Sequence, residues 1–185
     1  MLASCDRECF SGFMPIRVHR PPKIRDNNGP GIFLAGPIQG APNWQSDAEH
    51  HFASLLRNDT VVNIFNPRAD SLDHTKEHQI RWEKKYLLHA RRYGAILFWF
   101  AAQDYSIEDY PEGRAYAQTS RIEFGRSIGW KDYDHLVRLG VGIDPQYSGN
   151  VDYIKSCAAE HEIPVHENLG QLCSHVVELC QTEFV

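Results

Sequence analysis

The sequence contains no apolar run that approaches the ~20 residues needed for a membrane-spanning helix. It also lacks the apolar segment of a secretory leader near its start, where charged residues stand instead: Asp6, Arg7 and Glu8. An excess of positive charge is missing as well, because 19 Lys and Arg face 24 Asp and Glu, for a net charge of −5. These absences argue against a membrane partner and against nucleic-acid binding through a basic surface, and they favour a cytoplasmic protein.

Cysteine and histidine patterns typical of metal sites are also missing. The five cysteines are widely separated, apart from Cys5 and Cys9, and no second pair or histidine follows these two to complete a zinc site. The ten histidines are scattered. His74 and His78 have helical spacing, but no third ligand lies in register with them. We therefore expect free thiols in a reducing compartment, no metal and no other cofactor.

The chain has 185 residues, of which 42% are apolar and 23% are charged, as expected for one globular domain. Residues 1–30 are rich in proline and turn formers and are predicted to form a partly flexible N-terminal arm. Residues 31–185 then alternate short apolar runs with segments of helical periodicity, which predicts a single α/β domain.

The apolar runs predict five strands, at 32–35, 61–65, 95–100, 136–141 and 163–165. Helical spacing of apolar residues, including Ile80 on an inward face, predicts five helices, at 44–57, 79–92, 120–128, 151–160 and 169–180. The run at 95–100 is apolar at every position, as the centre of a parallel sheet requires. The expected fold is a three-layer α/β/α sandwich with a five-stranded parallel sheet.

Two places in this pattern point to a binding crevice. Glu123 stands between Ile122 and Phe124 at the predicted opening of a helix, after the polar loop that follows the central strand. The first strand ends in Gly36-Pro37, where glycine lets a ligand approach the backbone and the next amides can hold a sugar hydroxyl or a phosphate. Both lie where open α/β sheets bind ligands, so we expect a small enzyme with a catalytic carboxylate.

Five motifs in chain order carry a resemblance to a known family: F-L-A-G-P-I (33–38), N-W-Q (43–45), Q-x-x-W-E (79–83), L-F-W (97–99) and T-S-R-I-E-F-G (119–125). Together they resemble the nucleoside 2-deoxyribosyltransferase family, in its branch with F-L-A-G-P and T-x-x-x-E-F-G signatures. The resemblance implies a flavodoxin-like fold and transfer of a 2-deoxyribosyl group between nucleobases. It also implies a nucleoside or nucleotide substrate, a free nucleobase as acceptor, and a homo-oligomer in which a neighbouring subunit completes each site.

The resemblance identifies Glu123 as the nucleophile and Glu83 as its helper, which would orient sugar hydroxyls or assist protonation of the departing base. The chemistry agrees, because cleavage of an N-glycosidic bond builds positive charge at C1′ that a carboxylate can trap. We expect the helix N-terminus to keep Glu123 ionised. The alternative for Glu123 is an ordinary first-turn glutamate that complements the helix dipole.

Further residues are predicted to contact the substrate. Gln79 stands one turn before Glu83 and should share its helix face, from which it could hydrogen-bond a base. Asn66 and Trp99 follow or end strands and are candidates for base contacts, with core packing as the alternative for Trp99. Trp44 is expected to be a wall of the pocket or a hydrophobic anchor. The motifs add the other predicted substrate-binding residues: Pro37, Ile38, Trp82 and Thr119.

Arg121 departs from the family pattern, which often has Asn two residues before the catalytic Glu. Its guanidinium could pair with Glu123, bind a substrate phosphate bidentately, or form a surface ion pair. Three alternatives to base transfer also stay open at this point. Water could intercept the glycosyl-enzyme, which would make the protein a nucleoside or deoxynucleotide N-glycosidase; the pocket could serve a non-catalytic nucleotide-sensing module; or the fold could bind a flavin.

Overall fold

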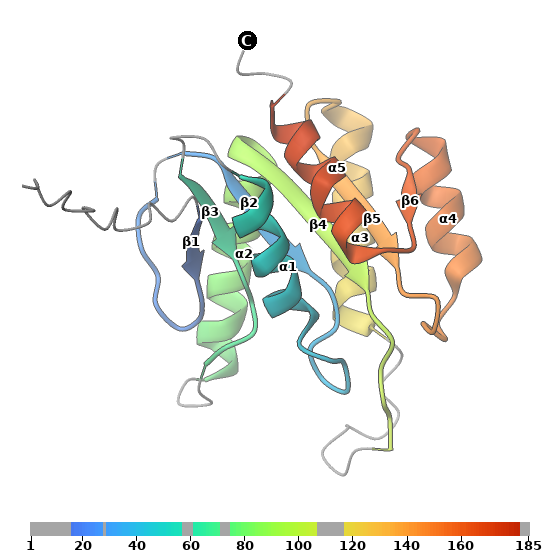
Figure 1. Cartoon of the computed structure of the whole chain (residues 1–185), viewed down its shortest axis with the longest axis horizontal. Helices are drawn as coiled ribbons and strands as arrows, with labels where there is room; N and C mark the ends of the chain where they lie inside the picture. Colours follow the sequence, from blue (N-terminus) through green and yellow to red (C-terminus); the bar gives the residue numbers. More distant parts are fainter. Residues whose placement is uncertain (1–15, 28, 57–60, 71–74, 107–116, 182–185) are drawn as a thin grey trace, which may run out of the picture.

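The computed structural model describes residues 16–27, 29–56, 61–70, 75–106 and 117–181 of the chain (Figure 1). The strands are β1 (Ile16–His19), β2 (Gly31–Ala35), β3 (Val62–Phe65), β4 (Gly94–Phe100), β5 (Leu139–Ile143) and β6 (Val165–His166). The helices are α1 (Trp44–Leu55), α2 (Lys76–Tyr93), α3 (Gln118–Tyr133), α4 (Val151–Glu160) and α5 (Leu169–Gln181).

The strands form one sheet in the order β1-β3-β2-β4-β5-β6, and every pairing is parallel. From β2 the chain steps outward to β3, then returns past β2 to β4 and continues outward on the other side. The direction of the crossovers therefore reverses between β2 and β4. In open α/β sheets this switch point, at the carboxyl ends of the strands, opens a crevice for ligands.

Helices cover both faces of the sheet (Figure 1). Helices α1 and α5 pack side by side on one face, and α2, α3 and α4 lie on the other. The pleat divides β2 accordingly, because Ile32 and Leu34 belong to the α1/α5 core while Phe33 and Ala35 belong to the opposite core. All of β4 is buried, as a central strand covered on both faces must be. The prediction of a three-layer α/β/α sandwich is thus confirmed.

The sheet has six strands rather than the five predicted, because residues 16–19 of the expected arm form the edge strand β1. Ile16 pairs with Val62 of β3, and the buried imidazole of His19 shares a 2.9 Å hydrogen bond with the side-chain oxygen of Asn63. This strand has only four residues and carries an arginine, so it lacks the long apolar pattern that identifies a central strand in a sequence. Residues 1–15, with Cys5 and Cys9, lie outside the described residues, as does His74.

Several predicted boundaries move. The fourth predicted strand begins three residues later, at Leu139, and Leu136 in the preceding turn is 54% exposed. Helix α2 begins at Lys76, after the cap Thr75, and its buried face includes Trp82. The prediction that Ile80 points inward is wrong, because that side chain is 61% exposed. In the described part of the chain, none of the helices is long and apolar enough to span a bilayer.

Candidate active site

A cavity of about 790 Å³ lies at the carboxyl edge of the sheet, next to the switch point. The turn after β2, the loop after β3, the first half of α2, the end of the β4–α3 loop and the first two turns of α3 contribute its walls. The cavity therefore brings together residues that are far apart in the sequence. Seven of the predicted site residues line it: Gly36, Pro37, Ile38, Gln79, Glu83, Thr119 and Glu123.

Two carboxyl groups face this cavity from different helices. Glu83 projects from α2 and Glu123 from α3, and both are partly buried. The side-chain nitrogen of Gln79 donates hydrogen bonds to Glu83 Oε1, at 2.7 Å, and to the Pro67 carbonyl, at 2.8 Å. The prediction that Gln79 shares a helix face with Glu83 is confirmed. This bridge ties α2 to the loop after β3 and fixes the orientation of the Glu83 carboxyl group.

The two carboxyl groups are electrostatically coupled. Burial raises the pKa of Glu123 to about 8, the negative charge of Glu83 adds to that rise, and Arg126 opposes it. Burial also raises the pKa of Glu83, against the hydrogen bond from Gln79, which lowers it. Both shifts therefore disfavour simultaneous ionisation of the two carboxyl groups. A pair in this state can act as an acid and as a base or nucleophile.

The expectation that the helix N-terminus keeps Glu123 ionised is wrong. Helix α3 begins at Gln118, so Glu123 lies in its second turn. The free backbone amides that favour negative charge are confined to the first turn of a helix. Desolvation in the cavity and the nearby charge of Glu83 therefore dominate. For the same reason Glu123 is not the ordinary first-turn glutamate of the alternative interpretation.

Gln103 was missed by the sequence analysis and connects the two loops that flank the cavity. Its side-chain nitrogen donates to the Gln39 carbonyl at 2.7 Å, and its side-chain oxygen accepts bonds from the Ala117 amide at 2.9 Å and from the Tyr105 hydroxyl at 2.8 Å. Ala117 adopts a left-handed conformation, with φ of 44°, immediately before α3. Gln103 thus anchors the start of the helix that carries Glu123. The sequence signal that could have identified Gln103 is its position as a polar residue just after the central strand β4.

Two predicted tryptophans lie beneath the Gly36-Pro37 turn instead of in the cavity. Trp44 is buried, and its ring N–H donates a 2.9 Å hydrogen bond to the Pro37 carbonyl. Trp99 is also buried, within the core that α1 and α5 cover. A Cβ on Gly36 would collide with the Trp99 carbonyl and the Trp44 ring. Glycine is therefore required here by the packing of the protein itself, and the two tryptophans support the turn from behind.

Asn66 and Trp82 do not line the cavity either. Asn66 is 1% exposed; its amide nitrogen donates to Glu49 Oε1 at 2.6 Å, and its oxygen accepts a 2.8 Å bond from the Arg68 amide. Trp82 is fully buried, and its ring N–H donates to the Lys23 carbonyl at 3.1 Å. Asn66 therefore shapes the loop after β3. Trp82 anchors α2 on the sheet, while the next residue, Glu83, faces the cavity.

Arg121 also lies away from the cavity wall. It is exposed on α3, and its charge acts on Tyr147, whose pKa burial raises and Arg121 lowers. The guanidinium that acts on Glu123 belongs instead to Arg126, which stacks over Trp130 with its Cζ 4.7 Å from the ring centre. Among the described residues, the cations that line the cavity are Arg68 and Lys76, and neither is predicted from the sequence.

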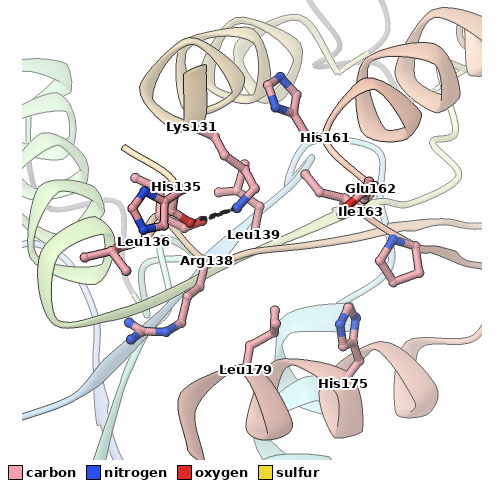
Figure 2. Close-up of a pocket in the computed structure, with 12 residues that line it drawn as sticks. Lys131, His135, Leu136, Arg138, Leu139, His161, Glu162, Ile163, His175 and Leu179 are labelled. Atoms are coloured by element: carbon pink, nitrogen blue, oxygen red, sulfur yellow. Dashed lines mark hydrogen bonds between the residues drawn. The ribbon is translucent and has the colours of Figure 1, made fainter. Parts of the chain in front are cut away.

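A smaller cavity of about 280 Å³ lies at the opposite, amino edge of the sheet, around the start of β5 (Figure 2). Figure 2 shows Lys131, His161 and His175 around it. The Lys131 ammonium donates to the Val137 carbonyl at 2.9 Å, and the His161 ring lies 3.2 Å from an Asp132 carboxylate oxygen. These polar groups serve the local packing of helix ends, and parallel sheets bind their ligands at the other edge.

The described residues contain no group of three or more His, Cys, Asp or Glu side chains placed to hold a metal ion. Cys157, Cys173 and Cys180 are free thiols, as predicted for those three residues. Neither models of known protein families nor curated proteins include a match to this chain. The site is thus defined by its own geometry: a coupled carboxyl pair in a cavity beside the switch point of a parallel sheet.

Proposed function

We propose that this protein transfers a 2-deoxyribosyl group between nucleobases through a covalent intermediate on Glu123. The observation that carries the proposal is the coupled pair Glu83–Glu123 in the cavity at the switch point. The strand order supports it: without the edge strand β1, the sequence β3-β2-β4-β5-β6 is the 2-1-3-4-5 order of flavodoxin-like folds, the fold that the motif resemblance implies.

The reaction proceeds in two displacements at C1′ of the sugar. First, the bond between C1′ and the base nitrogen breaks, its electron pair stays with the base, and the Glu123 carboxylate forms an ester bond to C1′. Glu83 donates its proton to the departing base. A second base then attacks C1′, the ester bond breaks, and Glu83 takes the proton that the incoming base releases. Two inversions give net retention at C1′.

The single proton of the pair determines which state reacts. In the free protein, burial and Glu83 favour the protonated form of Glu123. A nucleophilic Glu123 must be ionised, so the proton has to reside on Glu83 when the bond breaks. Positive charge that develops at C1′ stabilises the Glu123 carboxylate and moves the pair toward this arrangement. The raised pKa of Glu83 suits it to donate a proton to the base near neutral pH.

Hydrolysis is the second candidate function, since the same glycosyl-enzyme can react with water. The cavity volume of about 790 Å³ is compatible with hydrolysis, because a pocket of that size has room for water beside a nucleoside. A purely binding role leaves the coupled pair unused. We further propose that the active form is a homo-oligomer. Helix α3 offers a surface for self-association, because it carries two exposed apolar residues: Ile122, which is 66% exposed, and Tyr133, which is 93% exposed.

The test is chromatography of the protein with deoxyinosine, with and without adenine. Deoxyadenosine that forms only with adenine present supports base transfer, and hypoxanthine released in both mixtures supports hydrolysis. Intact-protein mass spectrometry during turnover should detect a deoxyribosyl adduct that is absent from Glu123→Gln and present in Arg121→Gln, the matched variant of an exposed residue on the same helix. If purine and pyrimidine deoxynucleosides and their 5′-phosphates all stay intact, the proposal fails.

A further inference from the structure

The loop after β3 holds a guanidinium rigidly against the cavity. Arg68 lines the cavity, and its Nε donates to the buried Gln45 side chain at 3.0 Å. Its Nη2 donates to the carbonyl oxygens of Pro42 at 3.0 Å and Ile38 at 3.2 Å. These bonds restrict the side chain before any ligand arrives. A cation fixed in this way can bind an anion at low entropic cost.

Among the described residues, the positive charge of Arg68 is not paired with a carboxylate. Glu49 accepts bonds from Arg20, at 2.6 and 2.7 Å, and from Asn66, and Asp70 also pairs with Arg20 at 3.4 Å. Within the described residues, every hydrogen-bond acceptor of the Arg68 side chain is a neutral oxygen. Burial lowers the pKa of Arg68, which reflects the cost of removing its charge from water.

A second cation completes this side of the cavity. Lys76 is the first residue of α2, where backbone amides also favour negative charge, and it lines the same cavity. Within the part of the chain that the structure describes, the cavity is thus lined by two cations, Arg68 and Lys76, and by a carboxyl pair, Glu83 and Glu123. A neutral nucleoside would use the carboxyl pair but would bring no anion to these two cations.

We infer that the substrate is a 2′-deoxynucleoside 5′-phosphate, whose phosphate binds Arg68 and Lys76 while its C1′ faces the carboxyl pair. This inference rests on the proposed function and specifies its substrate class. It also assigns phosphate recognition to the loop after β3 and the start of α2, because Arg121 lies outside the cavity lining. A guanidinium and a lysine ammonium both form charge-assisted hydrogen bonds with phosphate oxygens.

The test is calorimetric binding of dAMP, deoxyadenosine and inorganic phosphate to the Glu123→Gln protein, in which no product forms. We expect dAMP to bind at least about ten-fold more tightly than deoxyadenosine, as a charge-assisted phosphate contact provides. Arg68→Gln and Lys76→Gln should each reduce that ratio, and the matched control Arg121→Gln should leave it unchanged. The ratio should also fall at high salt. Because Arg68 also holds the β2–α1 loop, Lys76→Gln is the variant that leaves that loop intact.

Equal affinity for dAMP and deoxyadenosine would overturn the inference, as would a preference for dAMP that survives in both Arg68→Gln and Lys76→Gln. Inorganic phosphate that binds as tightly as dAMP would also overturn it, since the site would then serve a free anion. The failure of the proposed function looks different. If dAMP binds through its phosphate in a way that depends on Arg68 and Lys76, but the native protein does not turn it over, the phosphate site is supported and glycosyl transfer is refuted. Base exchange on nucleosides, without any preference for their 5′-phosphates, supports the proposed function and refutes this inference.

Discussion

Replacing Glu123 by glutamine should stabilise the folded protein at alkaline pH while it removes activity. The pKa of Glu123 rises from an ordinary value of 4.5 to about 8 in the folded state. Between these two pH values the folded chain keeps a proton that the unfolded chain has released. The contribution of Glu123 to stability is therefore fully present below about pH 4.5 and is lost as pH rises through about 8. Glutamine is neutral at every pH and avoids that loss.

The size of the effect follows from the pKa shift. One pKa unit corresponds to about 1.4 kcal/mol, so the shift from 4.5 to about 8 gives an upper limit of about 5 kcal/mol. Glu123 faces an open cavity, and water there screens its charge. We therefore expect Glu123→Gln to gain about 2 kcal/mol of unfolding free energy relative to the native chain between about pH 5 and pH 9.

Urea unfolding followed by tryptophan fluorescence over this pH range measures the effect. The quantity that matters is the difference in unfolding free energy between Glu123→Gln and the native protein, which should grow with pH and level off above about 8. Glu77→Gln, an exposed glutamate on α2, is the matched control for the loss of one surface carboxylate. A difference that stays constant from acidic to alkaline pH would refute the reasoning, because it would show that Glu123 ionises in the fold as it does in the unfolded chain.

Three further outcomes are expected. The rate of base exchange should fall above about pH 8, where the pair has no proton left to donate to the departing base, and a profile of the native protein without this alkaline limb would contradict the coupled pair. In Glu83→Gln any remaining rate should lack the alkaline limb, because the carboxyl group that is left, Glu123, reacts as the ionised nucleophile. Gly125→Ala should raise the unfolding free energy by about 0.4–1 kcal/mol in chemical denaturation, because this glycine lies inside α3 and an added Cβ would meet nothing within 4 Å. Gly129→Ala is the control, since that glycine has the same surroundings in the same helix. Destabilisation by either substitution would contradict the argument. Gln103→Leu should cost about 1–3 kcal/mol of stability and lower kcat through misplacement of α3, which full activity and native stability would disprove.

The sequence was sufficient for the layers of the fold because burial on both faces leaves a local pattern. The run at 95–100 is apolar throughout, and it forms the buried central strand β4 together with Gly94. The edge strand β1 leaves no such pattern: it has four residues, and only its pairing with β3 makes it a strand. Helix α3 extends beyond its predicted end at 128 to Tyr133, since Gly125 and Gly129 do not interrupt it.

The candidate site was only partly predictable, for a geometric reason. Neighbouring residues on a helix point about 100° apart, so a motif such as Trp82-Glu83 contains one residue that faces the core and one that faces the cavity. Spacing along the sequence placed Gln79 on the same helix face as Glu83, because residues four apart share a face, whereas the hydrogen bond between them was not predicted. Arg68 could not be identified in this way, since its position depends on bonds to α1 and to the β2–α1 loop.

The electrostatics of the cavity also discriminate among the candidate functions. Holding two carboxyl groups in one desolvated site raises the pKa of both, and this costs stability as pH increases. A ligand that brings developing positive charge to the pair offsets the cost, whereas a neutral or anionic group at that position does not. A sugar that becomes cationic at C1′ and carries a phosphate on its other side complements both the carboxyl pair and Arg68. A flavin would place no such charge beside Glu123, so the arrangement of charges favours cleavage of an N-glycosidic bond over flavin binding.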